Sequence, residues 1–169
     1  MRPVALLVAA LCLTAGCQNL APAEPEPTQE LQVSIDNGHD QGYVVQVAVV
    51  PDGPTTVELT FANGTNVTRE TDALVGRSPA QLGNVTDVQF AGATRSEAYE
   101  VPANSGVGAT LQGIEPGSSV WMLVWIGDDQ SQVRSWGVFN CSPETSVVVA
   151  DLDIAADGSI GLGTVCESS

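Results

Sequence analysis

The sequence contains no lysine, and its five basic residues, all arginine, stand against 20 acidic residues for a net charge of −15. A surface with this charge repels nucleic acid and anionic lipid headgroups, so we expect neither as a binding partner. Histidine is almost as scarce, since His39 is the single one. A copper site that needs two histidines and a cysteine is therefore excluded.

Catalytic signatures are missing as well. A serine triad would have to use His39, which lies in the polar cluster Asp36–Gly42, and the chain has no G-x-S-x-G elbow. Glycosidases use a pair of carboxylates, but no sequence feature distinguishes two of the 20 acidic residues as such a pair. A domain of this size also usually lacks the long loops that form a substrate cleft. We therefore expect no enzyme, no catalytic residue and no cofactor, and a small extracellular hydrolase is the weakest alternative.

The first residues carry the clearest indication of location. Arg2 precedes the apolar run Val4–Leu13, which is too short to cross a bilayer as a helix, and small residues follow the run. The segment Leu13-Thr14-Ala15-Gly16-Cys17 resembles the signal of prokaryotic lipoproteins. The resemblance implies cleavage after residue 16, lipidation of Cys17 and a membrane anchor on the extracellular face. An ordinary secretory signal is the alternative.

Three regions follow from this interpretation. Residues 1–16 form the signal peptide, residues 17–30 the lipidated cysteine and a disordered tether, and residues 31–169 a single β-sandwich domain. The tether is rich in proline and glutamate, cannot bury apolar surface, and is expected to be solvated and extended.

The acidic residues are scattered along the chain rather than clustered. Together with the absence of lysine, this composition resembles the proteome of extreme halophiles, notably haloarchaea. At molar salt the Debye length is only about 3 Å, so a large net charge maintains solubility without destabilising the fold by self-repulsion. An acidic surface that attracts cationic ligands is the alternative explanation.

The chain has four cysteines. If Cys12 leaves with the signal and Cys17 takes a lipid, Cys141 and Cys166 remain as an even pair in an oxidising compartment, where disulfides persist. A bond between them would add about 3 kcal/mol in the chain-entropy model. Free thiols or a metal site are the alternatives, and the absence of a C-x-x-C spacing disfavours the metal site.

Short apolar and alternating segments separated by turn residues fill the rest of the sequence. Residues 119–126 are apolar on both faces, with Trp121, Leu123 and Trp125 on one of them, which is typical of a central strand covered on each side. Helix is expected only briefly, near residues 70–75. About 8–10 strands of this kind predict an all-β antiparallel sandwich. The predicted strands are residues 31–35, 43–50, 55–61, 85–91, 109–111, 119–126, 132–139, 145–154 and 159–165.

Two local features of these strands are also predicted. Alternation over residues 132–139 places Arg134 and Trp136 on one face. The dipeptide Asp157-Gly158 predicts a type I′ hairpin turn between the last two strands.

Residues 109–120, ATLQGIEPGSSV, resemble the E–F region of fibronectin type III and related immunoglobulin-like domains, in which a leucine, a turn, Pro-Gly and a β-branched strand follow in that order. The family has a tyrosine where Val120 stands, so its tyrosine corner is missing here or is replaced by Trp121. The resemblance implies an immunoglobulin-like sandwich and carries no binding residues across.

Few residues are candidates for a site. Glycosylation sequons begin at Asn63, Asn66 and Asn84, and a fourth, at Asn140 beside a disulfide cysteine, is the poorest candidate. Asp36 and Asp40 weakly suggest a calcium loop, although the downstream bidentate glutamate and the correctly placed glycine are missing. The three tryptophans are expected in the core rather than in a ligand platform.

These observations predict a non-catalytic, lipid-anchored module on the surface of a halophilic prokaryote. It would act in interactions or in the envelope, with a surface protein or a glycan as partner. The partner face is expected at an edge strand or at loops far from the tether. A small-ligand or calcium-binding module is the alternative.

Overall fold

The computed structural model describes residues 28–53, 55–126, 132–142 and 144–168. The expected signal, Cys17 and nearly all of the tether lie outside these residues. Within them the chain forms eleven strands, the 3-10 helix η1 (Thr71–Leu74) and the single-turn helix α1 (Pro79–Leu82). The strands are β1 (Gln29–Asn37), β2 (Tyr43–Val50), β3 (Thr56–Phe61), β4 (Asn66–Glu70), β5 (Val85–Phe90), β6 (Arg95–Val101), β7 (Ser105–Ile114), β8 (Ser119–Ile126), β9 (Val133–Phe139), β10 (Thr145–Ile154) and β11 (Ile160–Ser168).

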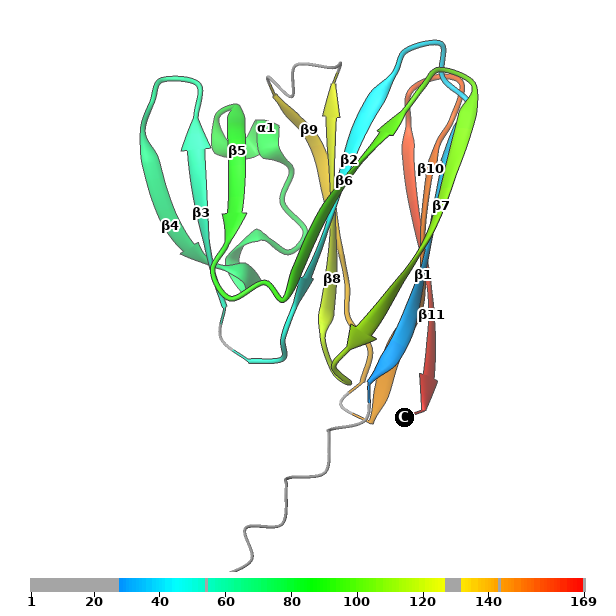
Figure 1. Cartoon of the computed structure of the whole chain (residues 1–169). Helices are drawn as coiled ribbons and strands as arrows, with labels where there is room; N and C mark the ends of the chain where they lie inside the picture. Colours follow the sequence, from blue (N-terminus) through cyan, green and yellow to red (C-terminus); the bar gives the residue numbers. More distant parts are fainter. Residues whose placement is uncertain (1–27, 54, 127–131, 143, 169) are drawn as a thin grey trace, which may run out of the picture.

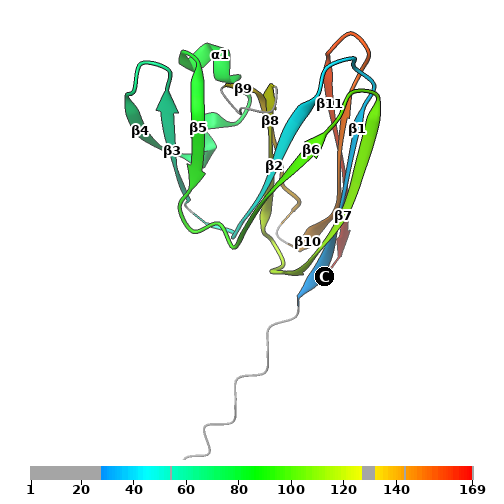
Figure 2. The same cartoon turned by 45° about the horizontal axis from the view of Figure 1, so that its top comes forward.

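The strands form three sheets stacked as layers (Figures 1 and 2). Sheet A has the order β11-β10-β1-β7, sheet B the order β6-β2-β8-β9, and sheet C the order β4-β3-β5. Sheet B is the middle layer, so both of its faces are covered. The fold is all-β and immunoglobulin-like, as the sequence predicts.

The middle position of sheet B follows from its two central strands. In β2, Val45 and Val47 pack toward sheet A, whereas Val44 and Ala48 pack toward sheet C. Strand β8 behaves in the same way, because successive side chains of a strand point to opposite faces. The predicted separation of its tryptophan face from its Val120–Met122–Val124 face is confirmed.

Sheet A is not purely antiparallel. Strands β1 and β10 pair in parallel, from Gln32 with Val149 to Asn37 with Ile154, while β1 and β7 pair antiparallel. Sheet C was not expected as a separate layer. Its β4 and the edge strand β6 of sheet B fall outside the predicted strands, and β7 is longer than the expected residues 109–111.

Two local expectations are wrong. The β8–β9 pairing shifts register between Val124 and Trp125, so β9 has a bulge at which Val133 and Trp136 are buried and Arg134 is exposed. A type I′ turn needs two positive φ values, but at Asp157-Gly158 only Gly158 has one, 77°. The amide of Gly158 donates to the carbonyl of Ala155, which closes the hairpin with a different turn.

The predicted disulfide between Cys141 and Cys166 is present, with 5.9 Å between the Cα atoms. Cys141 follows β9 in sheet B, and Cys166 lies near the end of β11 in sheet A. The bond therefore joins the two sheets of the larger sandwich at the end where β1 begins (Figure 1).

Asn37 connects the loops at the opposite end. Its buried side chain donates to the carbonyls of Gln41 and Pro102, at 2.9 Å each, and accepts from the amide of His39 at 3.0 Å. Buried polar groups need such partners, and here one side chain serves loops from both sheets of the larger sandwich.

Candidate binding groove

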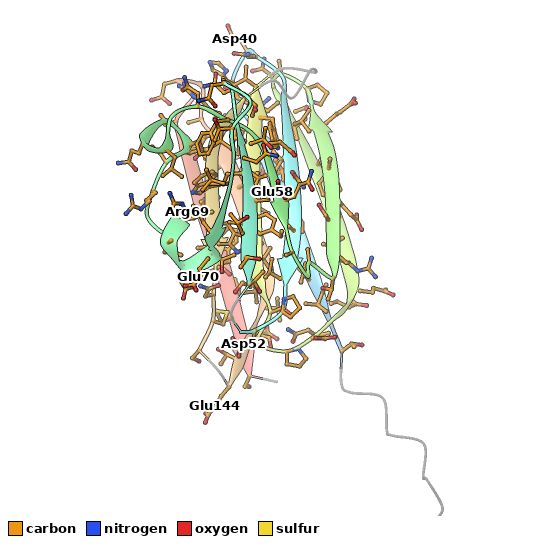
Figure 3. The ribbon with its side chains drawn as sticks, turned by 90° about the vertical axis from the view of Figure 1, so that its left-hand side faces the viewer. Asp40, Asp52, Glu58, Arg69, Glu70 and Glu144 are labelled. Carbon is orange, nitrogen blue, oxygen red and sulfur yellow. A yellow bond between two sulfur atoms is a disulfide. The ribbon has the colours of Figure 1, made fainter. Side chains whose placement is uncertain are left out.

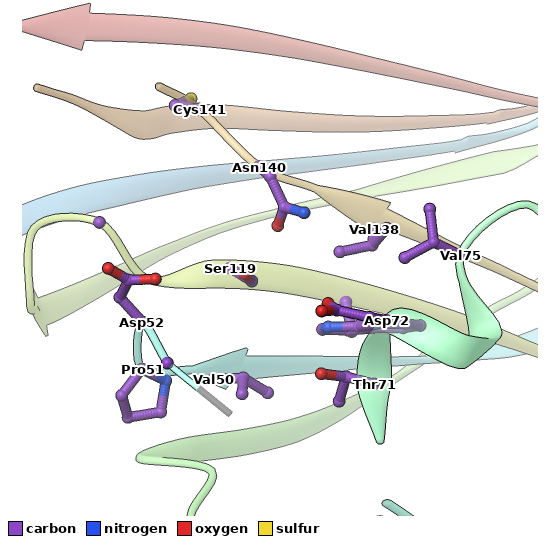
Figure 4. Close-up of a pocket in the computed structure, with 13 residues that line it drawn as sticks. Val50, Pro51, Asp52, Thr71, Asp72, Val75, Ser119, Val138, Asn140 and Cys141 are labelled. Atoms are coloured by element: carbon purple, nitrogen blue, oxygen red, sulfur yellow. The ribbon is translucent and has the colours of Figure 1, made fainter. Parts of the chain in front are cut away.

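A groove runs between strand β9 and the segment that contains η1 and the start of α1. Its lower part, about 470 Å³, begins at Asp52 and Asn140, and its upper part, about 380 Å³, ends at Arg77 and Gln81. Both parts are lined by Val75, Trp121 and Val138, so we treat them as one feature, the β9 groove. Figure 4 shows the lower part, with Asp52 toward one end and Val75 and Val138 toward the other.

One wall of the groove is a strand edge. Strand β9 is the last strand of sheet B and pairs only with β8. Among the described residues its other edge has no strand partner, and Ser135 to Val138 on it line the groove. A free edge of this kind presents backbone N–H and C=O groups to which an extended segment can pair.

The opposite wall is short and comes from the connection between β4 and β5. The amide of Val75 donates to the carbonyl of Asp72 at the end of η1, and the amide of Arg77 donates to the carbonyl of Leu74. These turns bury Leu74 in the core and leave the side chain of Val75 50% exposed beside the groove. Helix α1 then begins with a capping box between Ser78 and Gln81.

The tryptophans lie beneath the groove. Trp121 and Trp136 line it, and Trp125 packs in the same core. Their burial, with at most 9% exposed, confirms a core role over an exposed platform. The indole nitrogens of Trp125 and Trp136 have no hydrogen-bond partner among the described residues. Such a buried unpaired donor costs about 1–3 kcal/mol.

The charged groups around the groove have no ion-pair partner among the described residues. Asp52 and Asp72 line its lower part and are exposed, and Arg77 lines its upper part. The ion pairs found within the described residues are His39–Asp40 and Arg95–Glu97, at 3.5 Å each, and neither lies at the groove. The lower part therefore presents two free carboxylates to a binding partner.

The weak calcium candidates lie apart from the groove. Asp36 lies on the outer face of sheet A, opposite Asp153 of β10, and Asp40 lies in the β1–β2 loop with its side chain 92% exposed. No group of three or more His, Cys, Asp or Glu side chains that could hold a metal ion occurs in the described part of the chain. Figure 3 shows how widely the charges spread, with Asp40 at one end and Glu144 at the other.

The candidate glycosylation sites lie around sheet C. Asn63 lies in the β3–β4 turn, Asn66 begins β4, and Asn84 precedes β5. The amide of Ala62 donates to the carbonyl of Asn84 at 3.1 Å, so all three lie at one end of the sheet. Asn140 lies at the lower end of the groove instead.

Two groups in the described part of the chain have shifted pKa values, and both lie outside the groove. Burial, the hydrogen bond to Glu97 and the charge of Glu97 raise the pKa of Tyr99 to about 12. Hydrogen bonds from the side chain and the backbone of Ser159 lower the pKa of the fully exposed Asp157. Neither group marks a reactive site.

Sequence reasoning missed the groove. It expected a partner at an edge strand without saying which one, and neither Val75 nor Val138 was singled out. The one usable signal was the pair of apolar faces on residues 119–126, because it required a second covering layer. Which segment formed that layer depended on long-range pairing.

A family model for halobacterial Ig domain proteins matches residues 1–169. The chain belongs to this family. Membership in the halobacterial Ig domain family agrees with the immunoglobulin-like sandwich and favours a non-catalytic module. Such domains are typically found at the cell surface. Within the described residues, no helix has the length and apolar character needed to span a membrane.

Two further comparisons add little. A solved structure titled "Trapped Toxin" is similar over 81% of this chain and 24% of its own chain, with 13% identity and a TM-score of 0.33. This chain therefore spans about a quarter of that protein, and the similarity is too low to carry an argument. No curated protein matches the sequence.

Proposed function

We propose that this halobacterial Ig domain protein is an exported, lipid-anchored module that binds an extended segment of a surface protein along the β9 groove. The unpaired edge of β9 beside this groove carries the proposal. Strand addition to such an edge supplies main-chain hydrogen bonds, and neighbouring pockets supply specificity. Membership in a family whose domains are typically found at the cell surface supports the location.

The chemistry of the groove defines the segment. Apolar side chains fit between Val75 and Val138 above Trp121. A basic side chain fits the lower part, where Asp52 and Asp72 have no ion-pair partner among the described residues. The predicted partner segment is therefore extended and apolar, with an arginine or lysine near one end.

The predicted lipid anchor is consistent with a partner segment bound along the β9 groove. The chain enters the sandwich at the start of β1, at the end of the molecule that also holds Asp52 (Figures 1 and 3). A lipid on Cys17 and an extended tether would keep this end nearest the membrane. The groove, which runs along β9, would then rise from the membrane side toward the cell exterior.

The anchor is tested by Cys17→Ser. We expect the native protein in the membrane fraction, with an N-terminal peptide that begins at Cys17 and carries the lipid mass, and the variant without that mass. A native protein that retains residues 1–16, or that has an unmodified Cys17, would contradict the anchor.

The groove is tested by crosslinking in cells at native salt, followed by mass spectrometry. Val75→Glu places a charge on the groove wall. Val165→Glu is the matched control, since Val165 is 46% exposed and lies on β11 of sheet A. We expect a reproducible partner that is lost with Val75→Glu and kept with Val165→Glu. A partner kept by both variants would contradict binding at the groove.

A further inference from the structure

We propose that Asn63 carries an N-linked glycan, at the end of the molecule opposite the start of β1. The inference rests on the export that the proposed function requires, and on nothing about the β9 groove. A sequon is only a short pattern, and whether it is used depends on how the fold presents it; this chain has four.

The Asn63-Gly64-Thr65 sequon lies wholly in an exposed turn. The amide of Gly64 donates to the carbonyl of Phe61 at 2.8 Å, and Gly64 has a φ of 80°, a conformation that glycine adopts readily. The turn therefore projects from the end of the β3–β4 hairpin. All three sequon residues are exposed to solvent.

The reacting atoms of this sequon are free. The Asn63 Oδ1 atom accepts from the amide of Thr65 at 3.0 Å, which fixes the side-chain amide by its oxygen. Among the described residues the Asn63 Nδ2 atom and the Thr65 hydroxyl have no hydrogen-bond partner. Both groups that a transferase must contact are thus available in the folded protein.

Each of the other sequons has one of these groups engaged. The Asn66 Nδ2 atom donates to Glu58 at 3.1 Å, from a position already paired within sheet C. In the Asn84 sequon, the Thr86 hydroxyl donates to the carbonyl of Thr60 at 3.2 Å. In the Asn140 sequon, the Ser142 hydroxyl is within 2.8 Å of the Thr145 hydroxyl.

The reaction is a group transfer with no redox step. The Asn63 Nδ2 atom forms a bond to the anomeric carbon of an oligosaccharide, and that carbon loses its bond to the phosphate of a lipid-linked donor. The lipid phosphate leaves with the electron pair, and Nδ2 loses one proton. The donor class is therefore an oligosaccharide carried on a lipid phosphate.

The position of the glycan has a consequence for the whole molecule. The β3–β4 hairpin projects at the end opposite the start of β1 (Figures 1 and 2). A bulky polar glycan there would cover the outward end of sheet C and exclude protein partners from it. Binding would then be confined to surfaces such as the β9 groove.

The test uses the full chain expressed in a haloarchaeal host and purified from the exported fraction. Electron-transfer fragmentation of the peptide spanning residues 59–70 separates Asn63 from Asn66. We expect a glycan on Asn63, its loss with Asn63→Gln and with Thr65→Val, and its retention with Thr65→Ser, which keeps the sequon. Asn140→Gln is the control and leaves the mass of the glycan unchanged.

The outcomes separate the two proposals. Exported protein without a glycan on Asn63, or with higher occupancy on Asn66 or Asn84 than on Asn63, would contradict this inference alone. Protein that stays inside the cell with residues 1–16 attached would contradict export, on which both proposals depend.

Discussion

The interface between sheets A and B is filled mainly by aliphatic side chains and joined by a disulfide, whereas the interface between sheets B and C holds all three tryptophans beside an open groove. Both interfaces use the same strands of sheet B, since β2 and β8 contribute to each. The first has the features of a stable scaffold. Among the described residues, the second leaves two buried indole donors without a hydrogen-bond partner and one edge of β9 without a strand partner, and such an edge can pair with an extended segment.

The largest effects are expected from neighbouring residues on opposite faces of β8. Met122 and Leu123 are both fully buried, Met122 toward sheet A and Leu123 toward sheet C. Met122→Ala and Leu123→Ala should each lower the free energy of unfolding by about 2–5 kcal/mol. Only Leu123→Ala should change the tryptophan fluorescence of the native state. Equal fluorescence changes in both variants would mean that the two cores are not independent.

Removing the disulfide tests only the interface between sheets A and B. The Cys141→Ala/Cys166→Ala variant should lose about 3 kcal/mol of stability, because a closed loop no longer restricts the unfolded chain. Denaturant unfolding of the oxidised native protein and of the variant measures the difference. If the variant kept its stability but no longer bound the partner protein, the disulfide would support the shape of the groove rather than the stability of the sandwich.

A smaller effect is expected where the edge of sheet A meets β9. A methyl group on Gly137 would overlap the Cδ1 atom of Leu162, but this atom is the end of a flexible side chain that is 44% exposed and can move aside, so Gly137→Ala should lower the stability by less than about 1 kcal/mol. Leu162→Ala removes the overlapping atoms, and the double variant should recover part of the loss in a double-mutant cycle. Strictly additive losses would show that the two residues are not in contact.

The smallest effect concerns the alkaline limit of stability. The pKa of Tyr99 is raised to about 12, while the unfolded chain has the ordinary value of 10.0. Between these values the unfolded chain loses its proton first, so stability falls as the pH rises from about 10 to about 12. Tyr99→Phe should make this decline shallower, as measured by thermal unfolding at pH 9 to 12. If the fall of stability with pH were the same in Tyr99→Phe, other titrating groups would be its cause.

The sequence predicted the parts of the fold that have a strong apolar pattern. The ends of β2, β8 and β10 match their predicted residues, because these strands are buried and end at turn residues. It missed β4 and β6, whose side chains are mostly exposed and polar and therefore carry no alternation. The length of β7 was underestimated because its glycines weaken the strand pattern.

The remaining errors have long-range causes. The bulge at Arg134 depends on how β9 pairs with β8, and the parallel pairing of β1 with β10 joins strands more than 100 residues apart in sequence. The disulfide was predictable because the expected signal and lipid leave only one pair of cysteines. The β9 groove was not, because its two walls come from segments that no local pattern connects.

The most direct test of the groove is photo-crosslinking from a single position in living cells at native salt. A photoreactive residue is placed at position 75 in one variant and at position 165 in the other. The account predicts a crosslinked partner from position 75 and none from position 165, with the crosslinked partner peptide apolar and containing an arginine or lysine. Crosslinking from position 165 alone would contradict it and would place the partner on sheet A.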